Sequence, residues 1–421
     1  MHFRNTKTRC FTCSWEQRKL GDVAEHFEYG LNAAATEFDG VNKYLRITDI
    51  DDDTHEFRFD DLTTPQANLE TCSNYLLEKG DLLFARTGAS VGKTYLYRPF
   101  DGKVYFAGFL IRARVGNEAD SEFVFQSTLT ERYRRYISIT SQRSGQPGVN
   151  AQEYAELEIP LPSLPEQREI GSLLHGVDNL ITLHQRKHDR LVVLKKALLG
   201  RMFPRDGSRF PELRFDGFTD PWEQRKFSEV FSFLRNNTLS RAELSDSEGE
   251  TRDVHYGDIL IKFGEVIDVR RDELPRIASD ALAGRLSCQP LSNGDVIIAD
   301  TAEDEAVGKC SELRGCSDYP IVSGLHTMAC RPEFEFAPGY LGYYMNSPAF
   351  HDQLLPLMQG IKVISVSKGA ISDTDVRFPS LPEQKAIGAS LTELDNLITL
   401  HQRKLELLRN LKSACLDKMF V

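Results

Sequence analysis

One loop carries residue types that could bind a nucleotide phosphate. Residues 88–94 read Gly-Ala-Ser-Val-Gly-Lys-Thr, and such glycine-rich loops can cradle phosphates through their backbone N–H groups. The phosphate-binding pattern needs four residues between its glycines, and this loop has three. A second copy at residues 303–310 lacks the first glycine and the hydroxyl, and its Glu-Asp-Glu run would repel a triphosphate. We therefore predict a loop between strands that ends in a basic residue, with a nucleotide-dependent nuclease or ATPase as the weaker alternative.

Other combinations of reactive residues are no stronger. Glu383 and Lys385 resemble part of a nuclease acid-x-lysine pattern, but the glutamate is explained as a helix-capping residue. Cys10 and Cys13 form an isolated pair, and structural zinc usually needs four ligands, so we expect free thiols. We find no glycine-rich cofactor loop after a strand, no methyltransferase signature and no histidine pair with metal spacing. The sequence predicts a non-catalytic chain.

The elements that would position any functional residue are two copies of a long helix. Ser-Leu-Pro-Glu-Gln at 163–167 recurs at 380–384, and ten identical residues at 178–187 recur at 395–404. Each copy opens with the Ser-x-x-Glu pattern of a capping box. The helical pattern continues to about residue 202, a length of roughly 57 Å at ~1.5 Å per residue. The chain is thus a tandem duplication with the helices as its frame.

The helices are predicted to pair along one apolar stripe. Spacings of three and four residues place this stripe on one face, as in a coiled-coil seam. His184 and His401 fall on the stripe, as do Lys187 and Lys404, and we expect polar positions that set the register rather than metal ligands. The predicted frame residues are Ile170, Val177, Leu180, Leu191, Leu198, Ile387, Leu394, Leu397, Leu408 and Leu411.

A second repeat marks the start of each globular stretch. Trp-Glu-Gln-Arg-Lys at 15–19 recurs at 222–226, and residues 80–87 resemble residues 294–301 as a turn followed by a buried strand. Strands mixed with helices predict α+β globules that have diverged more than the helices. We expect a first globule at 1–162, a central helix at 163–203, an ordered connector at 204–221, a second globule at 222–379 and a C-terminal helix at 380–421.

Composition excludes little beyond a membrane protein. The 421 residues contain no apolar run near the ~18 residues of a membrane span and no apolar core of a signal peptide. Eight scattered cysteines suggest a reducing, cytoplasmic setting. The net charge of −11 does not exclude nucleic acid, because DNA binding needs only a local basic face.

At this point the motifs resemble a known family. The opening segment at 15–19, Gly-Asp-Leu-Leu-Phe-Ala-Arg-Thr-Gly at 80–88 and Leu-Pro-Ser-Leu-Pro-Glu-Gln-x-x-Ile at 161–170 are similar to those of the specificity (S) subunit of type I restriction-modification systems. The resemblance covers nearly the whole chain. It implies an α+β fold with two tandem target-recognition globules, separated by two helices that pack as an antiparallel coiled coil with pseudo-two-fold symmetry. The connector segment 210–218, which precedes the second opening segment, has no clear counterpart in residues 1–14, which precede the first.

The resemblance also implies a function and partners. Each globule would read one half of a split double-stranded DNA site, while the helices would space the halves and dock two methylation subunits. Restriction subunits would complete the complex; S-adenosylmethionine, ATP and Mg²⁺ would bind those partners and no cofactor would bind this chain. A protein-only adaptor that does not bind DNA is the alternative. The candidate DNA contacts are Arg86, Thr87, Ser90, Lys93, Gln146, Asn150, Thr301, Lys309, Lys362 and Lys368.

Overall fold

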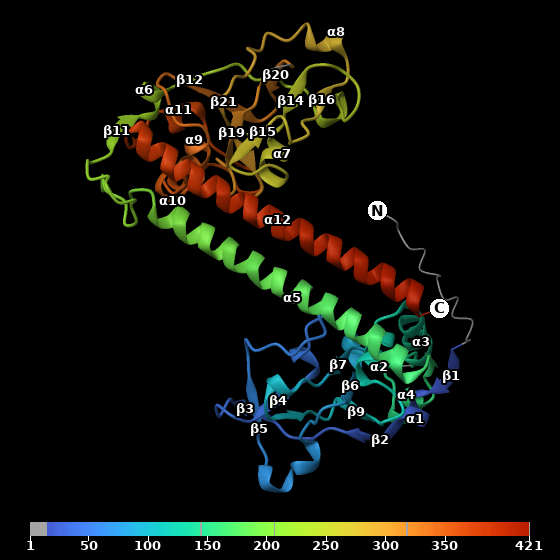
Figure 1. Cartoon of the computed structure of the whole chain (residues 1–421). Helices are drawn as coiled ribbons and strands as arrows, with labels where there is room; N and C mark the ends of the chain where they lie inside the picture. Colours follow the sequence, from blue (N-terminus) through green and yellow to red (C-terminus); the bar gives the residue numbers. More distant parts are fainter. Residues whose placement is uncertain (1–14, 144, 206, 317–318, 421) are drawn as a thin grey trace, which may run out of the picture. The chain divides into compact units, whose positions relative to one another are not determined.

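The chain divides into two compact units that do not follow its linear order. The computed structural model describes residues 15–143, 145–205, 207–316 and 319–420 (Figure 1). The first unit joins the chain up to Arg186 with the segment from Gln402 onward, and the second unit is Lys187–His401. Each long helix, α5 (Leu164–Arg201) and α12 (Leu381–Met419), therefore contributes one section to each unit. The unusual segment 1–14, with Cys10 and Cys13, lies outside the described residues.

The first globule is built around a buried antiparallel sheet. Its strand order is β2–β9–β6–β7, and Leu82 of β6 pairs with Ala113 on one side and Leu96 on the other. Every residue of β6 is buried because alternate side chains enter different cores. Leu82 and Phe84 face the core formed with the helices, whereas Leu83 and Ala85 face the core on the opposite side.

The elements of this globule follow in chain order. They are β1 (Glu16–Lys19), α1 (Leu20–Val23), β2 (Ala24–Tyr29), β3 (Ala35–Glu37), β4 (Lys43–Leu45), β5 (Thr63–Pro65), β6 (Asp81–Ala85), β7 (Thr94–Leu96), β8 (Val104–Phe106), β9 (Leu110–Val115), α2 (Ser121–Ser127), α3 (Glu131–Thr140), α4 (Ala151–Ala155) and β10 (Glu158–Leu161).

The second globule repeats this plan with a wider sheet. Its order is β12–β21–β17–β19–β15, and the central strand β17 is again buried throughout, with alternate residues in two cores. A further sheet, β13–β16–β14–β20, lies in the same unit. The predicted α+β class is thus confirmed for both globules.

The bounds of the second globule's elements are β11 (Glu223–Lys226), α6 (Phe227–Val230), β12 (Phe231–Phe233), β13 (Leu244–Ser245), β14 (Arg252–Val254), α7 (Tyr256–Ile261), β15 (Val266–Asp268), β16 (Arg276–Ile277), α8 (Asp280–Ala283), β17 (Val296–Ala299), β18 (Thr301–Ala302), β19 (Cys310–Arg314), β20 (Ile321–Ser323), β21 (Thr327–Pro332), α9 (Tyr340–Asn346), α10 (Pro348–His351), β22 (Ile364–Ser365), α11 (Lys368–Ser372) and β23 (Asp375–Phe378).

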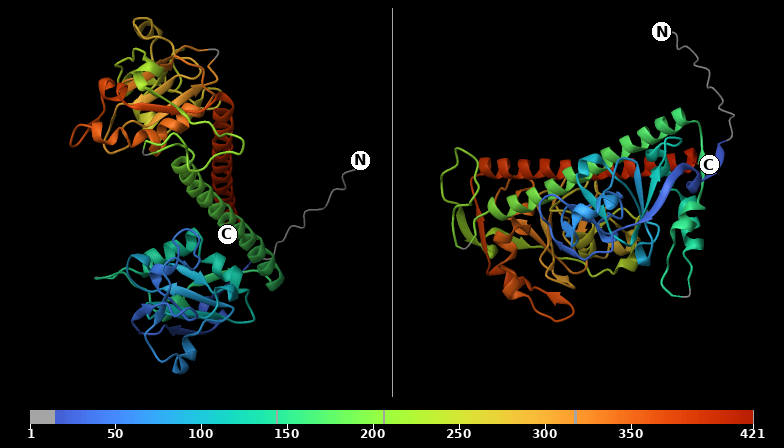
Figure 2. Two further views of the ribbon diagram at one scale, coloured as in Figure 1. Left: turned by 90° about the vertical axis from the view of Figure 1, so that its left-hand side faces the viewer. Right: turned by 90° about the horizontal axis from the view of Figure 1, so that it is seen from below.

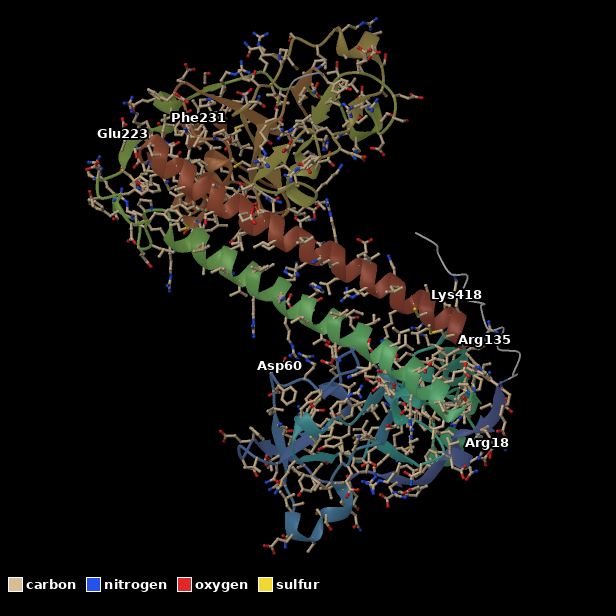
Figure 3. All side chains as sticks on the ribbon, in the orientation of Figure 1. Arg18, Asp60, Arg135, Glu223, Phe231 and Lys418 are labelled. Atoms are coloured by element: carbon tan, nitrogen blue, oxygen red, sulfur yellow. The ribbon has the colours of Figure 1, made fainter. Side chains whose placement is uncertain are left out.

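The repeated opening segment closes each globule beside its helix. In the first copy it forms β1, which pairs antiparallel with β10, the strand that leads into α5. In the second copy it forms β11, which pairs with β23 before α12, and Glu223 and Phe231 mark the start of β11 and of β12 in Figure 3. Identical sequence thus performs the same structural role twice.

A buried glutamine anchors the first turn of each long helix to its globule. The side-chain oxygen of Gln167 accepts the N–H of Asp120 (2.9 Å), and its amide donates to the carbonyl of Pro162 (2.9 Å). The repeat-equivalent Gln384 accepts from Ala337 (3.0 Å) and donates to Pro379 (2.9 Å). Both side chains are almost fully buried, so this polar contact fixes where each helix leaves its globule.

One glycine on each helix permits a close approach to the globule. A Cβ on Gly171 would lie 2.9 Å from Asp120 Oδ1 and 3.0 Å from the backbone nitrogen of Phe123, at the start of α2. A Cβ on the equivalent Gly388 would lie 3.3 Å from the carbonyl oxygen of Pro338, just before α9. A larger residue would push each helix away from the globule.

Within each unit the two helix sections run antiparallel. In the first unit Asp178 and Lys412 form an ion pair (2.6 Å), and an apolar cluster of Val177, Ile181 and Leu405 lies beside it. In the second unit Lys195 and Asp395 form the equivalent pair (2.7 Å). Asp178 and Asp395 occupy the same repeat position, as do Lys195 and Lys412. The duplicated sequence therefore makes the same contact twice. In the first unit α5 supplies the aspartate and α12 the lysine, and in the second unit α12 supplies the aspartate and α5 the lysine.

The predicted phase of the seam is partly wrong. Leu180 and Leu411 are exposed (45% and 48%), whereas Leu174 and Ile181 are buried. Pairs of adjacent apolar residues give the helix two neighbouring apolar faces that could each form the seam. The globule packs against the face that contains Gln167, Gly171 and Leu174, and this face is the buried one. The remaining predicted frame residues, Ile170, Val177, Leu191, Leu198, Ile387, Leu394, Leu397 and Leu408, are buried or half-buried.

The capping role predicted for Glu383 is also corrected. Its carboxylate accepts from both the Nε and the terminal nitrogen of Arg214 (2.8 Å each) and lies 3.4 Å from the indole nitrogen of Trp222. Arg214 belongs to the connector predicted at residues 204–221. The glutamate is used for a buried ion pair that ties the connector to α12.

An aromatic residue that follows each long helix completes the core of one globule. Trp222 packs edge-on against Phe203, which follows α5 (6.2 Å between ring centroids). Trp15 packs in the same way against Phe420, which follows α12 (6.0 Å). Phe420 thus completes the core of the first globule.

Candidate nucleic-acid interface

The glycine-rich loop at 88–94 does not have the geometry of a phosphate cradle. The N–H of Gly92 donates to Ala85 (2.9 Å), that of Lys93 to Ser90 (3.0 Å), and that of Gly88 to Pro147 (3.0 Å). These donors are used inside the globule and do not converge on a ligand. The predicted loop between strands is confirmed, because it joins β6 to β7.

The lysines that end this loop in each globule are turned inward. Lys93 Nζ donates to the carbonyl of Ile50 (3.0 Å) and forms an ion pair with Asp52, and only 12% of its side chain is exposed. Lys309 Nζ donates to Leu260 (3.0 Å), and burial lowers the pKa of its ammonium. We therefore leave both lysines out of the proposed DNA surface.

Asn150 also has a structural use. Its side-chain oxygen accepts the N–H of Glu153 (2.9 Å), and Glu153 accepts the N–H of Asn150 (2.8 Å), which is a reciprocal cap on α4. Ser90 lies half-buried in the short 3₁₀ turn Gly88–Ser90. Both polar side chains are therefore less available to a ligand than those of the residues around Arg86.

A cluster of exposed residues surrounds Arg86 at the end of β6. The Arg86 guanidinium lies 5.1 Å from the centre of the Tyr29 ring, and its backbone N–H donates to Phe109 (3.0 Å). The two aromatic side chains are 44% and 59% exposed. Thr87 pairs with Gly148, and a Cβ on Gly88 would lie 3.0 Å from Gln146 Nε2. The Arg86 cluster, comprising Arg86, Thr87, Gln146, Tyr29 and Phe109, combines cationic, amide and aromatic groups on one edge.

An equivalent cluster surrounds Asp300 at the end of β17. The Thr301 hydroxyl donates to Asp300 Oδ1 (2.8 Å), which lies 3.4 Å from His326 Nδ1. The His326 ring packs edge-on against Tyr256 (5.3 Å). His326 has a φ of 51°, a left-handed conformation that is unusual for a residue other than glycine. These four residues form the Asp300 cluster.

A tight loop projects beside each cluster. In the second globule Gln359 and Ser365 exchange two backbone hydrogen bonds (2.9 and 2.8 Å), and Ser365 pairs with Thr301. The tip carries Lys362 and Ile361, the latter 98% exposed. In the first globule the loop after α3 carries Gln146 and returns to Arg86 through the N–H of Val149 (2.9 Å); both loops extend from their globules in Figure 2.

The structure thus brings together part of the predicted set. Arg86, Thr87 and Gln146 gather in the first globule, and Thr301 and Lys362 gather in the second. Lys368 lies further along at the start of α11, 5.4 Å from the Phe233 ring. Sequence reasoning missed Tyr29, Phe109, His326, Tyr256 and Asp300, although the alignment of 80–87 with 294–301 already placed Asp300 opposite Arg86.

Comparison with known proteins identifies the class. Residues 13–192 match the family described as the type I restriction modification DNA specificity domain. Residues 13–192 carry this domain, and the resemblance of the chain to specificity subunits of type I restriction-modification systems, noted in the sequence, is confirmed. DNA recognition is therefore its class of function.

Relatives match over nearly the whole length. The type I restriction enzyme MjaVIII specificity subunit of Methanocaldococcus jannaschii is 20% identical, with 96% of this chain and 91% of that protein covered. The putative MjaX specificity subunit of the same organism is 21% identical, with 99% and 95% covered.

Solved structures share the fold. The crystal structure of the S subunit from M. genitalium has a TM-score of 0.57 at 13% identity, with 98% of this chain and 97% of that chain covered. A chain from a study of complex assembly and conformational transition in a type I system has a TM-score of 0.50 at 18% identity, with 97% of each chain covered.

No described helix is long and apolar enough to cross a bilayer. No group of three or more histidine, cysteine or acidic side chains among the described residues could hold a metal ion.

Proposed function

We propose that each globule reads one half of a bipartite, asymmetric DNA site. The Arg86 cluster with its loop would form the reading surface of the first globule, and the Asp300 cluster with residues 359–365 that of the second. Arginine, glutamine and aromatic groups on an exposed edge suit base edges and sugars, whereas Lys362 suits a phosphate. In this proposal the chain supplies recognition, and its partners carry out methyl transfer and cleavage.

This proposal rests on a contrast between the two long helices, which make equivalent contacts in both units, and the exposed edges of the globules, which carry different side chains. The anchors Gln167 and Gln384 make equivalent hydrogen bonds in the two units. Phe109 and His326, which occupy equivalent positions on the edges, have unrelated side chains. A duplicated scaffold that presents different side chains is what an asymmetric two-part target requires.

The long helices are the proposed docking sites for two methylation subunits and would set the gap between the half-sites. Apolar side chains remain exposed on the helix sections of both units, as expected of an interface in a larger assembly. Restriction subunits would join this complex, and S-adenosylmethionine, ATP and Mg²⁺ would bind the partners. The exposed helix residues are Leu173, Leu180, Leu183, Leu407 and Leu411 in the first unit and Val192, Val193, Leu194 and Leu400 in the second.

Genome-wide mapping of methylated bases tests the reading function. The chain is co-expressed with its methylation subunit, and single-molecule sequencing identifies the modified sites. We expect a split motif with two unequal specific halves around an unspecified gap. An assembled complex that yields no motif would instead favour the adaptor that does not bind DNA.

Charged substitutions on the helices test the docking function. Leu183→Glu with Leu407→Glu in the first unit should weaken methylation-subunit binding by at least about tenfold, because each would place a charge in an apolar contact. Co-purification and analytical ultracentrifugation measure the stoichiometry. Arg168→Glu, at an exposed helix position near the globule, is the control. Unchanged stoichiometry and affinity in the double variant would move the docking site elsewhere.

A further inference from the structure

Arg86 and Asp300 occupy the same backbone position in the two globules. Each directly follows an inner strand of its sheet, β6 or β17, and each donates its backbone N–H to the carbonyl of an edge residue, Phe109 (3.0 Å) or His326 (3.1 Å). Each carbonyl accepts the N–H of a valine that follows the projecting loop, Val149 or Val366 (2.9 Å both). Both are followed by a threonine that pairs with that loop.

The side chains at this shared position have opposite charge. The Arg86 guanidinium lies over the exposed Tyr29 ring, 5.1 Å from its centre, a contact with an aromatic face that favours arginine. Asp300 is held through Oδ1, which accepts from Thr301 and faces His326. Its carboxylate is 27% exposed. Both groups are therefore oriented by neighbours and reach solvent at the proposed reading surface.

The Asp300 carboxylate cannot serve as a phosphate anchor. Phosphates repel a carboxylate, so an acid at a DNA surface needs a hydrogen-bond donor, and base amino groups are the donors exposed in the major groove. The cytosine N4 amino group fits best, because the N6 amino group of adenine lies beside the acceptor N7. An arginine at the same position fits the two acceptors of guanine, O6 and N7.

We propose that Arg86 and Asp300 are matched specificity-determining residues. Arg86 recognises a guanine edge in one half-site, and Asp300 recognises a cytosine amino group in the other. This proposal rests on the proposed DNA-reading function. The two globules share a backbone at this position but carry opposite charges. In this proposal, that difference makes the two DNA half-sites differ at the corresponding base pair.

The test compares the methylated motifs of the assembled wild-type complex with those of Arg86→Ala and Asp300→Ala. Each variant should relax a single G·C pair in one half-site and leave the other half unchanged. Discrimination at that pair should fall roughly tenfold to a hundredfold, the range of a good base contact. Competition between cognate and singly substituted duplexes at low salt measures the same ratio for a variant that methylates too slowly to map.

Controls separate specificity from folding. Lys79→Ala removes an exposed cation at the opposite end of β6, and Glu335→Gln neutralises an exposed acid beyond the end of β21; both should retain the full motif. Thermal melting checks that all variants fold. Folded Arg86 and Asp300 variants with the wild-type preference at every position would overturn the assignment while the DNA-reading function stands. A wild-type complex without a split motif would instead overturn that function.

Discussion

At the scale of single residues, the side chains that fold this protein differ from those that would read DNA. Lys93, Lys309 and Asn150 looked like surface contacts in the sequence, yet each hydrogen-bonds within its globule. Gln167 and Gln384 were not among the predicted functional residues, yet both are buried and bridge two elements. Burial decides which role a polar side chain has.

The glutamine anchors can be tested by truncation. Gln167→Ala or Gln384→Ala leaves a buried N–H and a buried carbonyl without partners, so each should destabilise its own unit by about 1–3 kcal/mol. Hydrogen exchange at the first turn of α5 or α12 should increase in the matching variant only. Gln152→Ala, at an exposed position, is the control. Equal exchange in all three variants would contradict the anchoring role.

Buried acids in the second unit make its stability depend on pH. Burial raises the pKa of Asp253 to about 6 and that of Glu312 to about 7. Asp253 Oδ1 is buried, and the described residues offer it no hydrogen-bond partner. A raised folded-state pKa means that the folded protein holds a proton which the unfolded chain has lost, so stability falls as pH rises from about 4 to about 7.

Asp253→Asn should remove its share of that dependence. The asparagine can still accept from Asn237, whose amide donates to Asp253 Oδ2 in the native protein (2.6 Å). The variant should gain roughly 2–3 kcal/mol relative to wild type above pH 6 and little near pH 4. Thermal melting at several pH values measures the difference. A stability difference that does not change with pH would contradict the raised pKa.

At the scale of elements, the duplicated helices join both the globules and each other. Asp178 pairs with Lys412 and also accepts from Gln126 of α2 (2.7 Å). Asp395 pairs with Lys195 and accepts from the Tyr343 hydroxyl of α9 (2.7 Å). One aspartate in each unit therefore connects the globule to the opposite helix.

A double-mutant cycle measures this connection. Asp178→Ala and Lys412→Ala should each destabilise the first unit by about 1.5–3 kcal/mol, because a half-buried charge loses its partner. The double variant should cost less than the sum of the two, with a coupling of about 0.5–3 kcal/mol from denaturant unfolding. The same cycle on Lys195 and Asp395 should act on the second unit. If the two single effects simply add in the double variant, the ion pair contributes no coupling energy and the prediction is wrong.

At the scale of the whole molecule, described residues from the first and the last parts of the chain pack together in one unit. Leu416 and Phe420 belong to the core of the first globule, together with Phe123, and Trp15 packs against this cluster. The second unit is instead a single continuous segment. The first unit therefore cannot complete its core until the last turn of α12 and Phe420 have been synthesised.

Phe420→Ala tests this dependence. Removal of a buried phenylalanine should destabilise the first unit by about 3–5 kcal/mol and expose its amides to hydrogen exchange. Phe203→Ala is the matched variant, because Phe203 occupies the equivalent repeat position and its removal leaves the equivalent cavity in the core of the second unit. Exchange that increases in the second unit after Phe420→Ala would contradict the assignment of the C-terminus to the first core.

The repeats in the sequence were sufficient to predict the duplication and the paired helices, because identical segments of this length favour the same local structure. The mixture of strand and helix patterns predicted the α+β class, and the resemblance of the motifs indicated the family. Three features required non-local packing. Adjacent apolar pairs such as Leu180 and Ile181 left the seam phase open until the globule selected one stripe. Lys93 reads as an exposed cation until Ile50 and Asp52 surround it. The pairing of Phe420 with Trp15 has no local signal, because it joins residues at opposite ends of the chain.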